Sequence, residues 1–300
     1  AIADAPHSLV SQGVGYLEIP LTQAGEIDAD AVASEIERDP EISAIFVQRS
    51  RGYAPRPSLG IDACGRAFAR IRSARADLPI LVDNCYGELV EEREPTHVGA
   101  DVVMGSLIKN LGGSIAPAGG YVAGRADLLE RIAARHYAPG LGAALGPTLG
   151  YGRALMQGLF LAPAVVAASL RGLDFASALF DELGYPVDPQ PGARRTDIVQ
   201  AIRLGDASAL GRFARGLQRA MPVNARFRPE PGAVPGYAEP VIMSSGAFVA
   251  GATIELSCDA PLRPPYEVYL QGGVIFEHAL LGALFAAREV CESAKGREGE

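Results

Sequence analysis

The sequence predicts an α/β protein: a larger domain with a mainly parallel sheet, followed by a smaller C-terminal α/β domain. Two observations carry this prediction. Short apolar runs alternate with amphipathic segments through the first half of the chain, and strands that alternate with helices form parallel sheets with right-handed crossovers. After a long apolar segment the pattern changes, and the remaining segments describe a small domain with mostly antiparallel strands.

Length and composition limit the classes of function. A chain of 300 residues can bury a large core, and its net charge of −8 with scattered basic residues argues against nucleic acid as a partner. Four cysteines without a C-x-x-C pair and four histidines without ligand spacing predict neither a disulfide framework nor a metal site. No apolar run approaches a membrane span and the first residues lack a signal pattern, so we expect a cytoplasmic protein without a membrane partner.

The first half of the chain predicts strands and helices in turn. Alternation over 14–21 indicates a strand, and helical spacing over 28–38 indicates a helix. The next elements, in order, are a strand at 44–48, a helix at 61–75, a strand ending at Asp83, a short strand at 102–104 and a helix at 126–135.

Residues 151–170 predict a long helix that is too apolar for a free surface. We expect it between the two halves of the molecule or in a subunit interface. We place the domain boundary near residue 165, which gives domains at 1–165 and 166–300. The second domain is predicted to contain helices at 175–183, 207–220 and 276–291 and strands at 197–204, 241–243 and 252–256, before a charged tail at 293–300 that we expect to fray.

The segment 81–124 contains the residues with the most specific chemistry. One strand ends on Asp83, and the next leads to Ser106 and to Lys109, the only lysine before Lys295; glycines follow at once. In open α/β sheets ligands bind at the carboxyl ends of the strands. A carboxylate, a hydroxyl group and an amine are therefore expected at one edge of the sheet.

This trio is suited to pyridoxal phosphate chemistry. A lysine can form a Schiff base with the aldehyde, a carboxylate can keep the pyridine nitrogen protonated, and hydroxyl and backbone N–H groups can hold the phosphate. The same residues also fit a surface lysine at a strand end and an acid that caps a turn. The pattern alone leaves both interpretations open.

Short motifs extend this pattern over most of the chain. The first set is Asp83-Asn84, Gly99-Ala100-Asp101, Ser106, Lys109, Gly112-Gly113 and Gly124, and the second is the stretches 48–53, 83–88, 105–110 and 261–273. The first set resembles the cystathionine-lyase branch of fold type I pyridoxal phosphate enzymes of cysteine and methionine metabolism. The second resembles, more closely, the methionine gamma-lyase-like family often labelled aluminium resistance protein.

The resemblance implies a fold type I, transferase-like fold and a pyridoxal 5'-phosphate-dependent carbon–sulfur lyase that acts on a sulfur-containing or related amino acid. It implies that Lys109 holds the cofactor as an internal aldimine and that Asp83 sustains the pyridinium, so both are catalytic candidates. Ser106, Asn84 and Tyr86 are further candidates for cofactor binding, although a tyrosine at a strand end is more often core packing. Sites of this fold lie between two subunits, which implies a homodimer or homotetramer.

Arg263 is the first candidate for substrate binding. Prolines flank it at Pro261 and Pro264, and a guanidinium on rigid backbone is suited to bidentate capture of an α-carboxylate. The resemblance supports this role, because these enzymes use an arginine of the C-terminal domain for it. The alternative is a surface ion pair with Asp259 or Glu267.

Arg49 is the second candidate, in a loop that also carries Arg51 and Arg56. These guanidinium groups could reach a substrate carboxylate or a cofactor phosphate. Equally, they could form structural pairs with the glutamates at 88, 91, 92 and 94. Both interpretations stay open.

Two departures from the family pattern affect the prediction. Ile108 stands where the cystathionine-lyase branch has a hydroxyl residue that helps hold the phosphate. The family's N-terminal region, with its glycine-rich phosphate cup, has no counterpart before Ala1, so we expect an N-terminally truncated fragment. The alternative function is therefore a non-catalytic remnant of the fold that serves as an interaction or dimer module.

Overall fold

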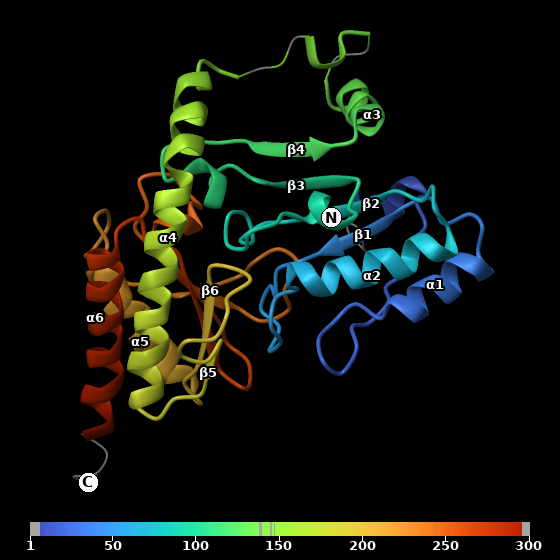
Figure 1. The fold of residues 1–300 in the computed structure, drawn as a ribbon. Helices are drawn as coiled ribbons and strands as arrows, with labels where there is room; N and C mark the ends of the chain where they lie inside the picture. The colour runs from blue at the N-terminus through green and yellow to red at the C-terminus, as the bar shows by residue number, and fades with distance from the viewer. Residues whose placement is uncertain (1–6, 138–139, 145, 147, 296–300) are drawn as a thin grey trace.

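A computed structural model describes residues 7–295 except 138–139, 145 and 147 (Figure 1). Its N-terminal half is built on a four-stranded sheet in the order β1-β2-β3-β4. The first three strands are parallel and β4 is antiparallel to β3. The strands are β1 (Ile45–Gln48), β2 (Ile80–Asp83), β3 (Val102–Ser106) and β4 (Gly120–Gly124).

Two helices, α1 (Ala29–Arg38) and α2 (Ile61–Ala74), lie together beside this sheet (Figure 1). Helix α1 begins where the Asp28 side chain accepts a hydrogen bond from the Ala31 N–H at 3.0 Å, which satisfies a free donor of the first turn. The apolar sides of both helices bury Ile36 and Phe68 against strand residues such as Val82. This packing fixes the strand ends from which the candidate site is built.

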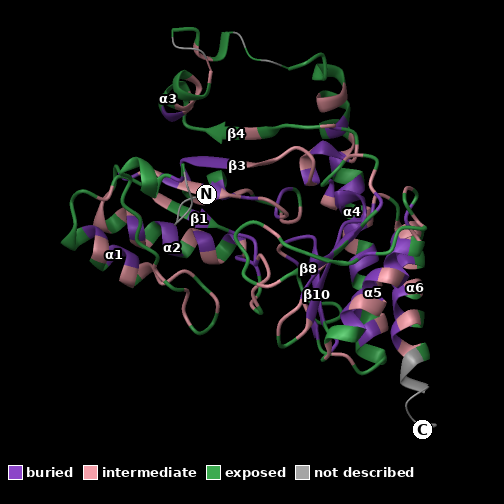
Figure 2. Ribbon diagram, turned by 180° about the vertical axis from the view of Figure 1, so that it is seen from behind, coloured by how far each residue is buried: buried purple, intermediate pink, exposed green. Residues whose placement is uncertain are grey.

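The C-terminal half is built on a six-stranded sheet in the order β5-β6-β10-β9-β8-β7, and every pairing in it is antiparallel. Its strands are β5 (Val187–Asp188), β6 (Val199–Arg203), β7 (Pro231–Gly232), β8 (Val241–Ser245), β9 (Ser257–Pro261) and β10 (Glu267–Gln271). Helices α4 (Gly152–Glu182), α5 (Ala207–Arg219) and α6 (Phe276–Lys295) pack beside it, and buried residues concentrate between these helices and the sheet (Figure 2).

Helix α4 connects the two halves and runs without a break through residue 165, the predicted domain boundary. The C-terminal half of α4 is buried, through Leu173 and Phe180, in the hydrophobic core beside the six-stranded sheet, whereas Phe160 in its N-terminal half is 82% exposed. By length and composition alone α4 could cross a membrane, contrary to the expectation that no segment approaches such a span. A core helix of a soluble protein passes the same test, so this is weak evidence for a membrane span.

The remaining helices are short or lie at the edges of the fold. Helix α3 (Ala126–His136) follows β4. The 3₁₀ helices are η1 (Val10–Gln12), η2 (Pro95–Val98), η3 (Asn110–Gly112), η4 (Gly142–Ala144) and η5 (Thr253–Glu255).

Most predicted elements are confirmed within a few residues, and two predicted strands are wrong. Residues 14–21 form no strand, and 252–256 contain η5, with the strand β9 only beginning at Ser257. Four strands were not predicted: the two-residue strands β5 and β7, β4, whose glycines are rare in strands, and β10, which is buried throughout and shows no alternation. The helices predicted at 151–170 and 175–183 are parts of α4. Of the predicted frayed tail, 296–300 lies outside the described residues.

Candidate active site

The candidate site lies where β2 and β3 end. These strands are parallel neighbours in which Asp83 is paired with Met104. After β3 the chain turns tightly, and a Cβ at Gly112 would overlap the carbonyl oxygen of Leu107. This turn returns Lys109 to the loop after β2, where its Nζ lies 4.1 Å from the centre of the Tyr86 ring.

The loop after β2 is held in a conformation that a tyrosine rarely adopts. Tyr86 has a φ of 73°, in the left-handed region. The Asn110 side-chain amide donates to the carbonyl oxygens of Tyr86 and Glu88 at 3.1 and 2.9 Å, and the Ile198 N–H also donates to Tyr86 O at 3.1 Å. The residue next to Lys109 therefore fixes the loop on which Lys109 rests.

Lys109 and Asp83 both affect the pKa of Cys85. Burial raises the pKa of this thiol to about 11, while the Lys109 ammonium lowers it in part and the Asp83 carboxylate raises it further. Burial lowers the pKa of Lys109, but interactions with Tyr86 and Cys85 outweigh this and leave that pKa raised. Without a ligand, Lys109 is therefore an ammonium ion held over an aromatic ring.

Asp83 and Ser106 retain hydrogen-bonding capacity toward a ligand. Asp83 Oδ1 accepts from the Cys85 N–H at 3.0 Å, and a carboxylate has further lone pairs. Ser106 Oγ accepts from the Ile108 N–H at 3.3 Å, which leaves the hydroxyl proton to donate. An amine, a carboxylate and a hydroxyl donor at one sheet edge fit the aldehyde, ring nitrogen and phosphate of pyridoxal phosphate.

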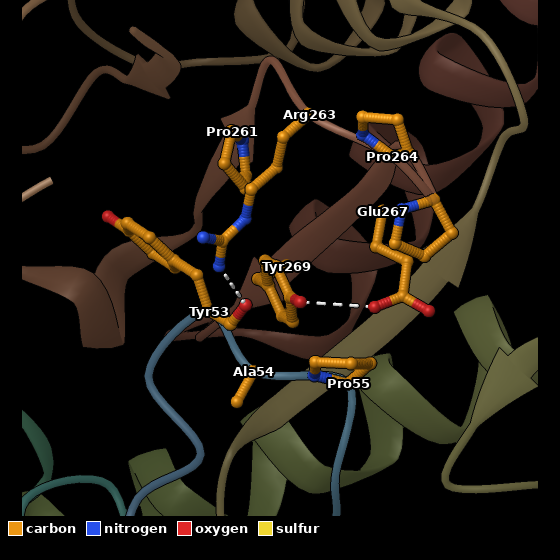
Figure 3. A pocket seen from close by; sticks show the side chains of 9 residues that line it. Tyr53, Ala54, Pro55, Pro261, Arg263, Pro264, Glu267 and Tyr269 are labelled. Carbon is orange, nitrogen blue, oxygen red and sulfur yellow. Dashed lines mark hydrogen bonds between the residues drawn. The ribbon is translucent and has the colours of Figure 1, made fainter. Parts of the chain in front are cut away.

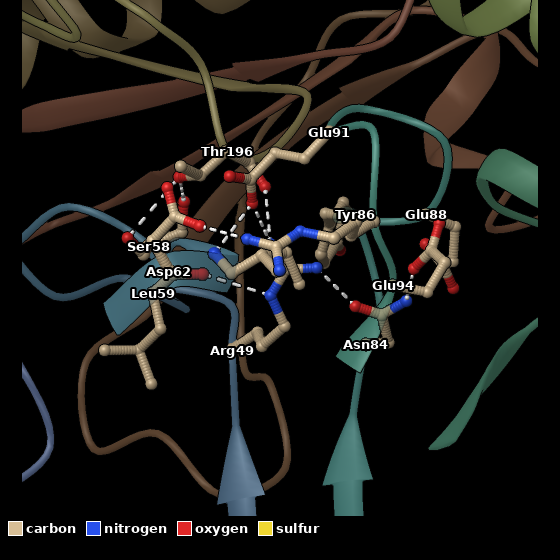
Figure 4. A network of polar contacts seen from close by, with 12 residues as sticks. Arg49, Ser58, Leu59, Asp62, Asn84, Tyr86, Glu88, Glu91, Glu94 and Thr196 are labelled. Atoms are coloured by element: carbon tan, nitrogen blue, oxygen red, sulfur yellow. Dashed lines mark hydrogen bonds and ion pairs between the residues drawn. The ribbon is translucent and has the colours of Figure 1, made fainter. Parts of the chain in front are cut away.

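Asn84 and Arg49 lie together in a buried network of polar contacts (Figure 4). Asn84 Oδ1 accepts from Arg49 Nη1 at 2.5 Å, and its amide donates to Glu94 at 2.7 Å. Arg49 is 1% exposed and also donates to Glu91 Oε2, Leu59 O and Thr196 O. Each Arg49 nitrogen has a protein partner, which favours the structural interpretation of Arg49 and a structural role for the Asn84 side chain.

The other two arginines of that loop also bind protein groups. Arg51 pairs with Asp188 at 2.5 Å, and Arg56 donates to the carbonyl oxygens of Ser50 and Pro57. These contacts favour structural roles for both residues.

Arg263 lines a cavity of about 310 Å³ beside the second sheet (Figure 3). Its Nη2 donates to the carbonyl oxygen of Tyr53 at 2.8 Å, and its Nη1 lies 3.6 Å from Glu239. Glu267, one of the two partners considered for it, instead binds Arg203 at 2.9 Å and Tyr269 at 3.1 Å. Arg263 is thus partly exposed in a cavity walled by Tyr53 and Tyr269.

Two carboxylates near Lys109 were not recognised as site residues from the sequence. Glu88 is 1% exposed, accepts a hydrogen bond from Tyr121 at 3.0 Å, and has a pKa raised to about 7 mainly by burial. Asp259 accepts from the Gln271 amide at 2.9 Å, and burial raises its pKa while the charge of Lys109 lowers it in part. The alternation within β9 could have indicated Asp259 had the strand been predicted at 257–261.

A family model described as methionine gamma-lyase matches residues 3–291. An uncharacterized Bacillus subtilis protein, YnbB, is 44% identical over 271 residues. The chain belongs to the methionine gamma-lyase family. These residues make up 90% of this chain but 64% of YnbB, so the chain spans less than two thirds of the length of that relative.

Solved structures of this family have the same fold. A Clostridium acetobutylicum protein classed as a cystathionine beta-lyase involved in aluminum resistance is 42% identical with a TM-score of 0.91, over 96% of this chain and 67% of that one. A carbon-sulfur lyase involved in aluminum resistance from Clostridium novyi is 38% identical with a TM-score of 0.89, over the same shares of the two chains.

A more distant structure, the pyridoxal-5'-phosphate-dependent protein YhfS of Escherichia coli, is 19% identical with a TM-score of 0.54, over 90% of this chain and 66% of that one, and shares the fold alone. The predicted fold class is confirmed: this methionine gamma-lyase family chain has the fold of fold type I pyridoxal phosphate enzymes.

Removal of the Arg49 side chain should test its structural role. Arg49→Ala leaves Glu91 and Asn84 without their buried cation, so we expect the free energy of unfolding to fall by about 3–5 kcal/mol. Urea denaturation measures this change. In the matched control, Arg66→Ala, an exposed pair with Glu26 is lost and the change should stay within about 0.5 kcal/mol. Equal, small losses in both variants would contradict the structural role.

Glu88 should make stability depend on pH. Its pKa is raised from 4.5 to about 7 in the folded state, so the folded protein binds more protons than the unfolded chain between these values. Stability is therefore lost as pH rises from about 4.5 through 7, by at most about 3.4 kcal/mol. Urea denaturation of Glu88→Gln at pH 5 and pH 8 should show this loss much reduced relative to wild type. An unchanged difference between the two pH values would exclude Glu88 as its source.

Proposed function

We propose that the chain forms the core of a pyridoxal phosphate-dependent carbon–sulfur lyase that acts on a sulfur-containing or related amino acid. The observation that carries the proposal is the placement of Asp83 at the end of β2 and of Lys109 after its parallel neighbour β3, with Lys109 Nζ over the ring of Tyr86 in the loop that follows Asp83. Membership of the methionine gamma-lyase family supports the lyase class. The names of the Clostridium structures support carbon–sulfur bonds as the bonds that are broken.

The cofactor, when bound, supplies an electron sink that weakens the bonds at the α-carbon of an amino acid. In this proposal Lys109 holds the aldehyde carbon and, once displaced, moves the α-proton with its amine. Asp83 keeps a proton on the ring nitrogen by its negative charge. Ser106 donates its hydroxyl proton to the phosphate, with Ile108 contributing only its backbone N–H to the same turn.

Substrate capture is assigned to Arg263 in this proposal. Prolines on both sides restrict its backbone, and its side chain is 37% exposed in the cavity beside Tyr53. A guanidinium with donors left over can bind both oxygens of an α-carboxylate. The second substrate-binding prediction, Arg49, is not carried into the proposal because that side chain is surrounded by protein acceptors.

We further propose that the protein works in the cytoplasm as a homodimer or homotetramer. Support comes from the N-terminal half of α4, where Met156, Leu159 and Phe160 are exposed on a largely apolar helix. Exposed apolar side chains grouped on one element are typical of an interface.

Cofactor attachment should be specific to Lys109. After incubation with pyridoxal phosphate and reduction with borohydride, mass spectrometry of the digested chain should find the adduct on Lys109, because this lysine is beside the strand-end carboxylate. Lys109→Arg should abolish the adduct, and Lys295→Arg should retain it. An adduct on Lys295, or none in the wild type, would reject the proposal.

Asp83 should matter for turnover more than for attachment. In Asp83→Asn the borohydride adduct should still form, but turnover of sulfur-containing amino acids should fall on the order of 10²-fold or more, because a neutral amide does not hold the pyridinium proton. The control is Asp62→Asn, in which the exposed Asp62 of α2 loses its pairs with Arg93 and Arg194, and it should keep wild-type turnover. Near-normal turnover in Asp83→Asn would give that carboxylate a different role.

A further inference from the structure

Asp259 is the carboxylate that the second sheet presents to Lys109. Side chains alternate along β9, so Cys258 and Ala260 are in the core beneath the helices while Asp259 points to the opposite face. On that face it is paired in register with Tyr269, which packs with Tyr53 and Tyr86 of the N-terminal half. Asp259 therefore lies on the face of the second sheet that packs toward the N-terminal half.

The groups around Asp259 orient it without neutralising it. Gln271 donates its amide to Oδ2 at 2.9 Å. The Tyr53 phenol acts on the same carboxylate and lowers its pKa in part, and Tyr53 is itself held between Tyr269 and Tyr237, with ring centres 5.6 and 4.6 Å away. The hydrogen-bond partner of Asp259 is thus a neutral amide, whereas the guanidinium of Arg263 is directed to Glu239 and Tyr53 O.

The titratable groups on the same side of the sheet as Asp259 are Tyr53, Tyr86 and Lys109, whereas Cys258, its neighbour in β9, is in the core. The pKa values of Tyr53 and Tyr86 are raised by burial, so both keep their protons, and Lys109 is already an ammonium ion. Burial also raises the pKa of Asp259, while Gln271, Tyr53 and Lys109 lower it in part. Of this group, Asp259 is the carboxylate, so its oxygens are the acceptors for the proton of an amine.

An amino acid arrives with its nitrogen as an ammonium group, and only the neutral amine is a nucleophile. We propose that Asp259 binds this ammonium group and accepts one of its protons, so that the free amine is generated beside Lys109. In this step one N–H bond breaks, its electron pair stays on nitrogen, and an O–H bond forms on Asp259, with no oxidation or reduction. The inference deepens the proposed function, on which it rests, by assigning amine recognition to the second sheet.

The first test uses protein in which borohydride has fixed pyridoxal phosphate to Lys109, so that a ligand amine forms no bond to the cofactor. Isothermal titration calorimetry compares L-methionine with 4-(methylthio)butanoate, which has the same chain and carboxylate but no amine. The wild type should bind methionine about 10-fold or more tightly, the size expected for a charged hydrogen bond. Asp259→Asn should lose this preference while its affinity for the butanoate stays within about twofold.

Two further variants serve as controls for this comparison. Asp259→Glu keeps an acceptor and should retain part of the preference, which loss of folding would not explain. Glu292→Gln removes the same charge at an exposed pair with Arg288 and should behave as wild type. Equal binding of the two compounds by the wild type, or an intact preference in Asp259→Asn, would overturn the proposal.

A second test needs no cofactor and separates this inference from the proposed function. Acetylation of Lys109 by acetic anhydride, followed by mass spectrometry across a pH series with Lys295 as internal reference, reports the pKa of Lys109. Asp259→Asn removes a facing negative charge, so the rise in Lys109 acetylation should shift to lower pH. An unchanged profile would show that Asp259 does not act on Lys109. If the acetylation profile of Lys109 shifts in Asp259→Asn but the wild type forms no borohydride adduct, the cofactor assignment is rejected and the action of Asp259 on Lys109 stands.

Discussion

The buried guanidinium of Arg49 is the constraint on which the site depends. A charge removed from water needs a partner for each of its donors, and Arg49 finds these in the segments after β1 and β2 and in the segment before β6. The same requirement explains Gly87, where a Cβ would overlap the guanidinium. The Arg49 side chain therefore joins the segments that follow β1 and β2 and connects the C-terminal half of the chain to them.

The loop after β2 is held from both sides, and this determines which of its residues face the ligand. Arg49 and Glu94 bind Asn84 on one side, and Asn110 binds the backbone of Tyr86 and Glu88 on the other. Between these anchors the chain takes the left-handed conformation at Tyr86. Strain of about 1–3 kcal/mol at such a residue persists only where its surroundings fix it, and here the fixed turn gives Lys109 a ring to rest on.

The sequence predicted the parts of the site that depend on local pattern. Asp83 and Lys109 each follow a short apolar run, and parallel pairing of β2 and β3 brings such ends together, so their meeting could be expected. For Arg49 the sequence left the structural and substrate-binding interpretations open, because the burial that favours the first follows from contacts with residues up to 147 positions away. Asp259 was missed for a different reason. The predicted strand at 252–256 ended before β9 begins at Ser257, so Asp259 was not assigned to either face of a sheet.

The charged side chains on the two sides of the loop after β2 have different kinds of partner. Behind it, Arg49 and Glu91 form a pair whose side chains are nearly inaccessible and whose hydrogen bonds end on protein groups. On the other side, Lys109 rests on an aromatic ring, Asp83 takes one backbone N–H, and Asp259 accepts from an amide. Neutral partners orient a charge without cancelling its field, and away from bulk water that field is stronger. A zwitterionic ligand with its own ammonium and carboxylate is complementary to such a site, because it can pair with charges of both signs that neutral groups hold in place.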